Sequence, residues 1–168
     1  MTYSDLFRAL NAANVRYLIA GGFAVNLYGY VRLTVDLDLA LALDEVNLNS
    51  AINTLTGLGY RPQVPVPAAD LAKPGKRREW IEGKGALVFT FVQPDQPHHH
   101  VDVFLDLPFD FAAAWAARSE FHVDDVTLPT VGLETLIAMK RLAGRPRDIS
   151  DIEQLERISA MKKSGRIP

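Results

Sequence analysis

The sequence predicts a mixed α/β (α+β) fold. It consists of a short mixed β-sheet flanked by helices, with a helical pair at the C-terminal end. Residues 33–43 and residues 98–107 predict strands, because both segments place apolar side chains at alternate positions. The tail after residue 133 predicts helices, because its apolar residues recur at three- and four-residue spacing. Together these observations indicate a mixed core followed by helices.

Length and composition indicate one ordinary globular domain. The 168 residues are 48% hydrophobic and 23% charged, so a sizeable core can form. We expect a single domain over residues 1–168, with a core over 1–129 and a helical extension over 130–168. The net charge of −2 excludes the bulk basic field of sequence-blind DNA-binding proteins. The absence of cysteine excludes disulfides, cysteine-ligated metals and thiol catalysis.

No stretch of the sequence resembles a targeting or membrane-spanning segment. The first apolar run, residues 17–24, is interrupted by two glycines and lacks both a basic leader and a small-residue cleavage site. Nothing approaches the ~20 consecutive apolar residues of a transmembrane helix. We therefore expect a soluble, cytoplasmic protein without a membrane partner.

The N-terminal part of the chain alternates between helices and strands. Leu6 and Leu10 fall at helical spacing, and a glycine pair separates a short apolar run from a second helical segment. Gly59 follows a third helical segment and is typical of a helix C-cap. We therefore expect a helix over 3–13, a strand over 15–20, a helix over 23–28, the alternating strand over 33–43 and a helix over 46–58.

In the rest of the core, prolines, glycines and aspartates mark the turns. Residues 62–76 hold four of the ten prolines and predict a loop. Gly83 and Gly85 interrupt one alternating pattern, and Asp124 with Asp125 interrupts another, so each pair predicts a hairpin turn. We therefore expect a hairpin of 79–82 with 86–92, a strand over 98–107, a helix over 109–117 and a hairpin over 122–128.

The tail consists of two predicted helices. The first is expected over residues 133–142 and ends at Gly144, a residue typical of a helix C-cap. Pro146 then occupies the start of the second helix, where its missing N–H costs no hydrogen bond. Apolar residues at three-residue spacing predict the buried face of this helix, namely Ile149, Ile152, Leu155 and Ile158.

Two aspartates on the alternating strand are the sharpest chemical signal. Asp36 and Asp38 project from one face, ~6.6–6.8 Å apart along the strand, so both carboxylates can bind one or two hard cations. Ala40 and Ala42 on the same face leave room for a ligand. Since adjacent carboxylates repel each other, a metal or a basic partner is expected. The alternative is a solvated strand edge with acidic side chains.

A third aspartate completes this site if the two alternating strands are neighbours in the sheet. Asp102 lies mid-strand between two valines, whereas Asp106 on the same face is the competing candidate. Three carboxylates around two divalent ions suit phosphoryl or nucleotidyl transfer, because the ions align the attacking and leaving oxygens. The alternative is the ordinary polar face of a half-buried strand.

Gly21 and Gly22 lie between a predicted strand and a predicted helix. Glycines let the backbone approach a ligand closely, and the N-terminus of the following helix offers N–H donors to phosphate oxygens. A glycine pair at a tight strand-to-helix turn is also commonly structural. Here the pair gains significance from its position shortly before Asp36 and Asp38.

Four short motifs spread over residues 15–155 carry a resemblance to a known group of enzymes. They are Ala20-Gly21-Gly22, Arg32-x-Thr34-x-Asp36-Leu37-Asp38-Leu39, Val101-Asp102-Val103, and a tail of Lys140-Arg141 with Gly144-Arg145-Pro146-Arg147-Asp148-x-x-Asp151-Ile152. In this combination the chain resembles the minimal nucleotidyltransferases of the DNA polymerase β-like superfamily. That superfamily includes antibiotic nucleotidyltransferases and the toxins of AbiE-type toxin–antitoxin systems.

The resemblance implies a nucleotidyltransferase fold and Mg²⁺-dependent transfer of a nucleoside monophosphate (NMP) from an NTP to an acceptor hydroxyl, with release of pyrophosphate. Asp36, Asp38 and Asp102 would be the catalytic residues and would bind two Mg²⁺ ions, and Asp102 would help to deprotonate the acceptor. The residues implied to bind the nucleotide are Gly21, Gly22, Arg32, Lys140, Arg145 and Arg147. The acceptor would be a small molecule, a protein or an RNA, and a toxin-like enzyme would have an antitoxin protein as partner.

Several of these residues also have structural explanations. Arg32 would either contact phosphates or neutralise the aspartate pair. Arg147 and Asp151, four residues apart, would form an ordinary helix pair worth ~0.3–0.5 kcal/mol. Asp148 would be a helix N-cap, with Asp151 reaching back to it.

Two further clusters are expected to be peripheral. Consecutive histidines on a strand point to alternating faces, so no more than two of residues 98–100 could share a site, and His100 is the one beside Asp102 on its face. The basic cluster over residues 73–78 is expected to be a solvated surface, although an RNA acceptor could use it.

Two other functions remain open. One is a non-catalytic module of the same fold that binds a nucleotide or a protein, against which the mutual repulsion of three carboxylates argues. The other is a metal-dependent phosphohydrolase, which also uses clustered aspartates but usually needs histidine ligands, and only His100 is suitably placed.

Overall fold

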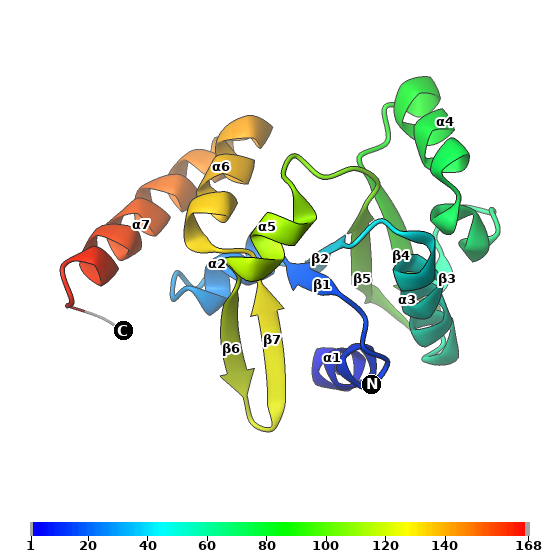
Figure 1. Ribbon diagram of the computed structural model, residues 1–168, viewed down its shortest axis with the longest axis horizontal. Coiled ribbons are helices and arrows are strands. Elements are labelled where there is room, and N and C mark those ends of the chain that lie inside the picture. Colours follow the sequence, from blue (N-terminus) through cyan, green and yellow to red (C-terminus); the bar gives the residue numbers. More distant parts are fainter. Residues whose placement is uncertain (1, 167–168) are drawn as a thin grey trace.

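The computed structural model describes residues 2–166, apart from the side chains of Pro97 and His98. The described residues form one mixed sheet with the strand order β3-β4-β5-β2-β1-β7-β6 (Figure 1). The strands are β1 (Tyr17–Ile19), β2 (Asp36–Leu41), β3 (Arg61–Pro62), β4 (Val88–Gln93), β5 (Gln96–Phe104), β6 (Ser119–Val123) and β7 (Val126–Thr130). The helices are α1 (Tyr3–Ala12), α2 (Gly21–Leu27), α3 (Glu45–Gly57), α4 (Pro74–Lys84), α5 (Phe111–Ala116), α6 (Leu133–Ala143) and α7 (Pro146–Lys163), with a 3₁₀ segment, η1, over Ala68–Ala72. The predicted fold class is confirmed.

The middle of the sheet brings the two alternating strands together. β2 pairs with β1 in antiparallel fashion and with β5 in parallel fashion. In the β2–β5 register Asp38 lies opposite Asp102, and Asp36 lies opposite His100. The neighbourhood on which the three-carboxylate hypothesis depended is therefore present in the fold.

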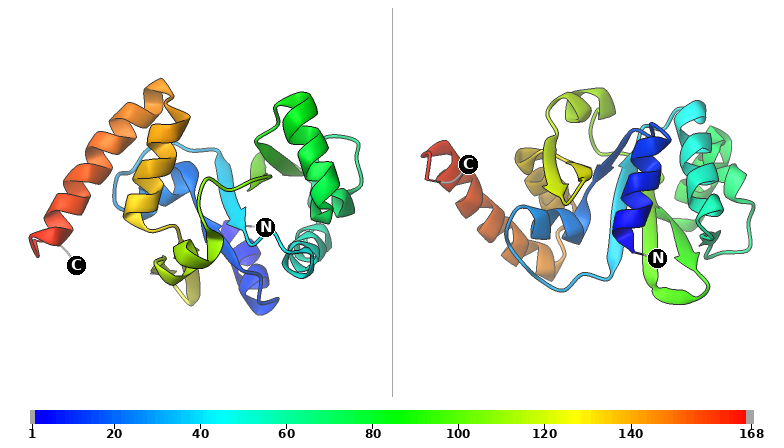
Figure 2. Two further views of the ribbon diagram at one scale, coloured as in Figure 1. Left: turned by 45° about the horizontal axis from the view of Figure 1, so that its top comes forward. Right: turned by 90° about the horizontal axis from the view of Figure 1, so that it is seen from below.

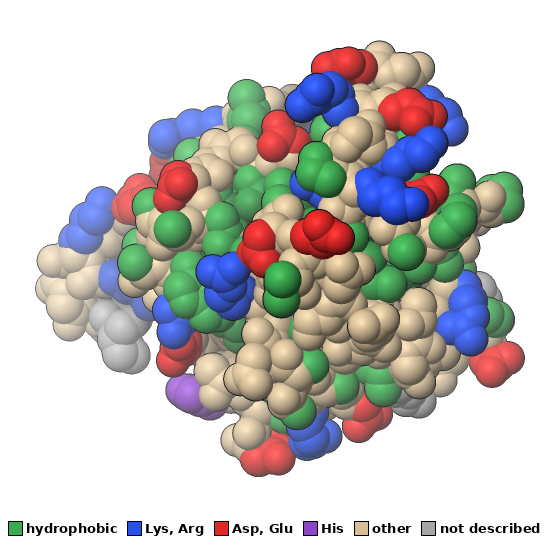
Figure 3. Space-filling model, turned by 45° about the vertical axis from the view of Figure 1, so that its right-hand side comes forward, with side chains coloured by type: hydrophobic (Ala, Val, Ile, Leu, Met, Phe, Trp, Pro, Cys, Tyr) green, Lys and Arg blue, Asp and Glu red, His purple; other side chains and the backbone are tan. Residues whose placement is uncertain are grey.

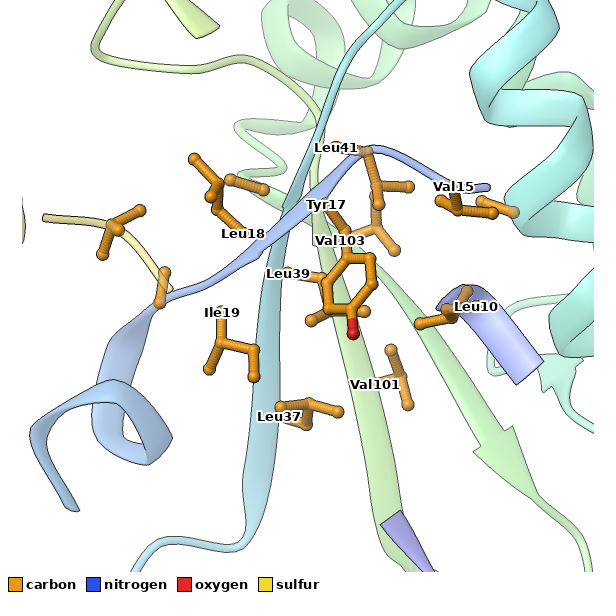
Figure 4. Packing of buried hydrophobic residues seen from close by; sticks show 14 of the residues in the cluster. Leu10, Val15, Tyr17, Leu18, Ile19, Leu37, Leu39, Leu41, Val101 and Val103 are labelled. Carbon is orange, nitrogen blue, oxygen red and sulfur yellow. The ribbon is translucent and has the colours of Figure 1, made fainter. Parts of the chain in front are cut away.

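One face of these strands forms the centre of the hydrophobic core. Leu37, Leu39 and Leu41 of β2 are buried against Val101 and Val103 of β5. Figure 4 shows Leu10 of α1 and Tyr17 of β1 beside them. Because strand side chains alternate between faces, the aspartates of β2 and β5 are left on the opposite face of the sheet.

The N-terminal end of the predicted strand over 33–43 is wrong. β2 begins only at Asp36, where its register with β5 starts, and Leu33 is 87% exposed. The hydroxyl of Tyr3 donates to the carbonyl of Val35 at 3.1 Å, so a side chain and not a strand satisfies this group. Alternation predicts the extended backbone, but a ladder needs neighbours, and β1 pairs only with the far end of β2.

The hairpin expected around Gly83 and Gly85 is also wrong. Residues 79–82 belong to helix α4, which has Pro74 at its first turn and ends at Gly85 in the left-handed conformation with φ +62°. β4 pairs instead with β5, which follows it. The helix is held by Trp80, which is buried with its ring centroid 5.3 Å from that of Phe89. Packing against the sheet therefore overrides the local alternation.

The C-terminal helices lie at one end of the molecule, with α3 and α4 at the other end (Figure 2). α6 and α7 confirm the predicted helical pair, and Leu136 and Leu155 belong to the main hydrophobic cluster. The expected buried face of α7 is partly wrong, because Ile149 is exposed. The residues of α7 that are buried are Asp148, Asp151, Leu155 and Ser159. Two carboxylates therefore lie at the interface that an apolar stripe was expected to fill.

Most of the other elements agree with the sequence. The predicted elements over 3–13, 15–20, 46–58, 98–107, 109–117 and 122–128 are all present with shifted ends, and α2 begins at Gly21 itself. No helix in the described part of the chain combines the length and the apolar character needed to cross a bilayer.

Candidate functional site

Three carboxylates from two strands line one cavity. Asp36, Asp38 and Asp102 all contribute to its wall, as the adjacent positions of β2 and β5 require. Asp102 accepts a hydrogen bond at 2.6 Å from the hydroxyl of Thr90 on β4. Asp36 lies 3.3 Å from Nδ1 of His100 and is half exposed. The competing candidate, Asp106, lies beyond the end of β5 and is exposed, although it lines an adjoining cavity.

Among the three carboxylates, Asp38 has the most strongly raised pKa. Burial, together with the smaller effect of the charges of Asp102 and Asp36, raises the pKa of its carboxyl from 3.8 to about 6. Burial also raises the pKa of Asp102, an effect that the hydrogen bond from Thr90 opposes. Within residues 2–166 neither Asp38 nor Asp102 forms an ion pair with a lysine or arginine. The site therefore holds negative charge that the protein itself leaves largely unneutralised.

This raised pKa predicts a dependence of stability on pH. The folded state binds the proton of Asp38 more tightly than the unfolded chain does, so its stabilising effect is complete below about pH 4 and is lost as the pH rises through about 6. In metal-free buffer the free energy of unfolding should fall by up to about 3 kcal/mol over this window. Urea denaturation between pH 4 and pH 7.5 measures it.

Asp38→Asn is the control for this prediction, because an amide does not titrate in this range. The unfolding free energy of the wild type minus that of the variant should fall by the stated amount from pH 4 to pH 7. Parallel curves for the two proteins would contradict the assignment of a raised pKa to Asp38.

The donor chemistry of the site fits a divalent cation such as Mg²⁺. Carboxylate oxygens are the ligands that hard cations prefer, and a cation would relieve the repulsion between Asp38 and Asp102. Among the described residues no three His, Asp or Glu side chains are already gathered as a metal-binding group. Asp36, which is half exposed and lies beside His100, is the member whose side chain has most freedom to adjust.

The glycine pair is packed directly against these acids. Gly21 begins α2 with φ +59°, and a Cβ atom built on it would lie 1.8 Å from Oδ2 of Asp38. A Cβ on Gly22 would lie 2.5 Å from Oγ1 of Thr34 and 2.9 Å from Nη2 of Arg32. Gly21 therefore has no room for a side chain, and a side chain at position 22 would force Thr34 and Arg32 to shift.

A comparison of Gly21→Ala with Gly85→Ala distinguishes the cost of the contact with Asp38 from the cost of a left-handed backbone. Both residues have a positive φ, but the space around a Cβ on Gly85 is open. Each substitution should cost about 1–2 kcal/mol for the left-handed backbone. Gly21→Ala should cost more and should also displace Asp38. Chemical denaturation measures both losses, and equal losses would contradict the close contact.

The cavity is also lined by cations from the loop before β2 and from the start of α7. Arg32, Arg145 and Arg147 line the same cavity as the three aspartates, with Gly22 and Thr34 between them. Arg32 forms an ion pair with Asp151 at 2.8 Å, so the expectation that it neutralises the aspartate pair of β2 is wrong. The cavity therefore combines fixed positive charge with the three carboxylates.

Lys140 lies behind these arginines and not among them. The side chain of Lys140 is only 3% exposed, and its Nζ lies 3.1 Å from Asp148 and 2.7 Å from Asp151. Asp151 therefore bridges Lys140 and Arg32, and the predicted helix pair with Arg147 is wrong. Charge networks of this kind fix side chains whose own rotamers would otherwise be free.

Asp148 also binds Arg145, which completes this network of ion pairs. It occupies the third position of α7, where it accepts hydrogen bonds from the backbone N–H and the Nε of Arg145, so the predicted N-cap role is wrong. Although burial alone would raise it, the hydrogen bonds from Arg145 and Lys140 lower the pKa of Asp148 to about 2. Asp148 is therefore ionised at neutral pH and anchors Arg145 at the edge of the cavity.

A second, apolar cavity adjoins the polar one and was not predicted. It has a volume of about 740 Å³ and shares Asp38, Asp102 and Arg145 with the polar cavity. Its other walls come from α4, β4, the segment after β5, and α6. Residues so far apart in sequence carry no joint local pattern, which is why sequence reasoning missed this half of the cleft.

The remaining candidates are peripheral or structural. Within the histidine cluster, His99 stacks on Tyr3 with ring centroids 4.9 Å apart, and the His98 side chain lies outside the described residues. Within the basic cluster, Arg77 is buried and donates to the carbonyl of Leu71. Lys73 and Lys76 pair with Asp70 and Glu79 respectively, and Figure 3 shows basic and acidic side chains intermixed over this part of the surface.

Comparisons with known proteins show what the chain is similar to. A family model described as "Nucleotidyl transferase AbiEii toxin, Type IV TA system" matches residues 4–164. No curated protein sequence matches the chain.

Solved structures share the fold at low sequence identity. The lincosamide antibiotic adenylyltransferase LnuA, bound to lincomycin, has a TM-score of 0.60 and 16% identity, over 92% of this chain and 94% of that one. ANT(2″)-Ia in complex with adenylyl-2″-tobramycin has a TM-score of 0.55 and 16% identity, over 96% and 95%. An antigenic nucleotidyltransferase-like protein from Paracoccidioides brasiliensis has a TM-score of 0.56 and 18% identity, over 90% and 72%.

Proposed function

Because the chain belongs to the AbiEii family of nucleotidyltransferases, we propose that it transfers an NMP from an NTP to an acceptor hydroxyl and releases pyrophosphate. The observation that carries this proposal is the presence of Asp36, Asp38 and Asp102 on one cavity wall. Asp38 and Asp102 are partly buried acids with raised pKa values, and three arginines line the same cavity. Anionic oxygens together with fixed cations suit a metal-bound triphosphate.

In the proposed reaction the acceptor oxygen attacks the α-phosphorus. The bond from that phosphorus to the oxygen that bridges to the β-phosphorus breaks, and pyrophosphate leaves with the electron pair. Asp102 takes the proton of the acceptor hydroxyl. The hydrogen bond from Thr90 to Oδ1 orients this carboxylate, and burial raises its pKa and so its basicity.

Asp36, Asp38 and Asp102 would hold Mg²⁺, and three carboxylates suit two ions. When bound, magnesium supplies positive charge that offsets both the carboxylates and the triphosphate. Gly21 matters here because its missing side chain lets the start of α2 approach Asp38. The metal proposal thus rests on donor chemistry and on unneutralised charge.

We assign the triphosphate to the polar cavity. Gly22, Arg32, Arg145 and Arg147 line it, and guanidinium groups suit phosphate oxygens because they donate in pairs. Lys140 acts differently from the residues that would touch phosphate. It holds Asp148 and Asp151, which in turn hold Arg145 and Arg32, so it is a positioning residue in this proposal.

The description of the family supports a toxin role with an antitoxin protein as partner. Under this proposal the modified acceptor is a molecule that the cell needs. The nucleotide used and the acceptor modified are properties that the assay below determines.

Incubation of the protein with Mg²⁺, each of the four α-³²P-labelled NTPs in turn, and pools of small molecules, proteins or RNA tests the proposal. We expect labelled acceptor and pyrophosphate with at least one NTP. Release of inorganic phosphate in place of pyrophosphate would favour the phosphohydrolase. NTP binding without transfer to any pool would favour the non-catalytic module.

Asp36→Ala is the first variant for this assay. We expect it to abolish transfer while changing the free energy of unfolding by no more than about 0.5 kcal/mol, because its side chain is half exposed. Thermal unfolding followed by circular dichroism checks the fold. Loss of the folded state would show that the aspartate is structural and would contradict its catalytic assignment.

A further inference from the structure

The apolar cavity beside the carboxylates has the form of a small-molecule site. Its volume of about 740 Å³ lies within the usual range for such sites. Its apolar lining comes from both sides of the cleft and includes Ile81, Leu87, Val88, Phe104, Leu136 and Met139. Figure 2 shows α6 and α4 on either side of the segment that follows β5, which bounds the cavity between them.

Two leucines of the lining are unusually exposed. Leu87, just before β4, is 77% exposed, and Leu142 on α6 is 74% exposed. Apolar side chains in a cavity are commonly covered when a ligand binds. An apolar body inserted between α4 and α6 would remove both leucines from water.

We propose that this cavity binds the acceptor, and that the acceptor is a small, uncharged molecule that presents its hydroxyl on an apolar body. This inference rests on the proposed function, and it adds the chemical class of the acceptor. Asp102, shared by both cavities, is then in reach of the hydroxyl that it deprotonates.

The geometry of phosphoryl transfer favours the acceptor over the nucleoside as occupant. In an in-line displacement the attacking oxygen and the leaving pyrophosphate lie on opposite sides of the α-phosphorus. Asp38 and Asp102 line both cavities, so with the β- and γ-phosphates on the arginines of the polar cavity, an attacking oxygen in the apolar cavity reaches an α-phosphorus held at these aspartates. The apolar cavity adjoins these two aspartates, where the attacking oxygen of the acceptor must lie. The nucleoside is bonded to the α-phosphorus through an oxygen that occupies neither in-line position.

The charges around the cavity favour an uncharged body over RNA. Asp106 is exposed and lines this cavity, and it would repel nucleic-acid phosphates. Of the two cations in the lining, Lys140 is neutralised by Asp148 and Asp151, and Arg145 is paired with Asp148. Arg77 of α4 is buried, and the neighbouring Lys73 is already paired with Asp70.

Binding of N-phenyl-1-naphthylamine, an uncharged apolar dye whose fluorescence rises on burial, tests this assignment with the full chain. We expect saturable binding to the wild type. The double variant Leu87→Gln/Leu142→Gln should weaken it roughly tenfold, since two apolar contacts are lost. The matched control Val46→Gln/Val64→Gln changes two exposed apolar residues outside the cavity lining and should leave binding unchanged.

Competition then identifies the occupant. The Mg²⁺ complex of an α,β-methylene NTP should bind by calorimetry without displacing the dye, and transfer RNA should not displace it either. Displacement by the nucleotide would assign the cavity to the nucleoside, and displacement by transfer RNA would assign it to a nucleic acid. Either result, absent dye binding, or equal losses in both double variants would overturn the inference alone. A wild type that binds no NTP would instead overturn the proposed function on which it rests.

Discussion

Asp102→Asn is expected to lower NMP transfer by about 10²–10⁴-fold, the usual contribution of a general base. The amide keeps the size of the side chain and can still meet Thr90, whose hydroxyl now donates to Oδ1 at 2.6 Å. It cannot accept the acceptor's proton. Single-turnover transfer from a labelled NTP measures the loss.

Asp106→Asn is the matched control for this variant. Asp106 lies four residues further along, lines the apolar cavity and is exposed. It should retain transfer within a few-fold of the wild type, while Asp102→Asn should also keep the wild-type unfolding temperature within a few degrees. Similar losses of activity in both variants would assign the base to the general negative charge of the cleft and would contradict a specific role for Asp102.

Lys140→Met is expected to destabilise the protein by about 3–5 kcal/mol, the usual cost of removing one partner from a buried ion pair. Lys140 is 3% exposed, and its removal leaves Asp148 and Asp151 buried, with only Arg145 and Arg32 to offset their charges. Urea denaturation measures the change. Because α6 and α7 meet through this lysine, we expect the helical pair to loosen first.

Two comparisons make this prediction specific. Lys163→Met removes the pair with Glu134, in which both side chains are largely exposed, and should cost no more than about 1 kcal/mol. Adding Asp151→Asn to Lys140→Met should recover part of the lost stability, because the uncompensated charge is removed as well. A Lys140→Met variant as stable as Lys163→Met would show that the buried network does not hold the helices.

The parts of the site that could be predicted from the sequence are those that local residue patterns indicate. Alternation identified the strands that carry Asp36, Asp38 and Asp102, because strand side chains repeat every second residue. The glycine pair was visible for a similar reason, since a tight turn needs residues without side chains. That β2 and β5 are neighbours is a tertiary fact, which the chemistry of the three acids suggested but no local pattern encodes.

The parts that could not be predicted depend on compensation between distant residues. On α7, Asp148 and Asp151 are buried with Leu155, at helical spacing, but polar residues do not register as a core face. Their burial is stabilised by Lys140 and Arg32 from elsewhere in the chain. The sequence did show the helical spacing of Asp148, Asp151 and Leu155. That spacing indicates a buried face only once Lys140 of α6 is known to pair with both aspartates.

Helix α4 illustrates the same limit for secondary structure. Alternation around Gly83 and Gly85 suggested a hairpin, whereas Pro74 at the first turn and Gly85 at the end are signals of a helix. Both patterns were present in the sequence. The burial of Trp80 against Phe89 favours the helix, and this contact arises only in the folded sheet.

The most direct test of the central claim, that the acids of β2 and β5 together bind the metal of an NTP complex, is a Mn²⁺ titration followed by electron paramagnetic resonance. With an α,β-methylene NTP present, we predict saturable binding to the wild type, abolished in Asp38→Asn and retained in Asp106→Asn. Binding that survives Asp38→Asn unchanged, or a wild type that binds no Mn²⁺ with the nucleotide, would contradict the account.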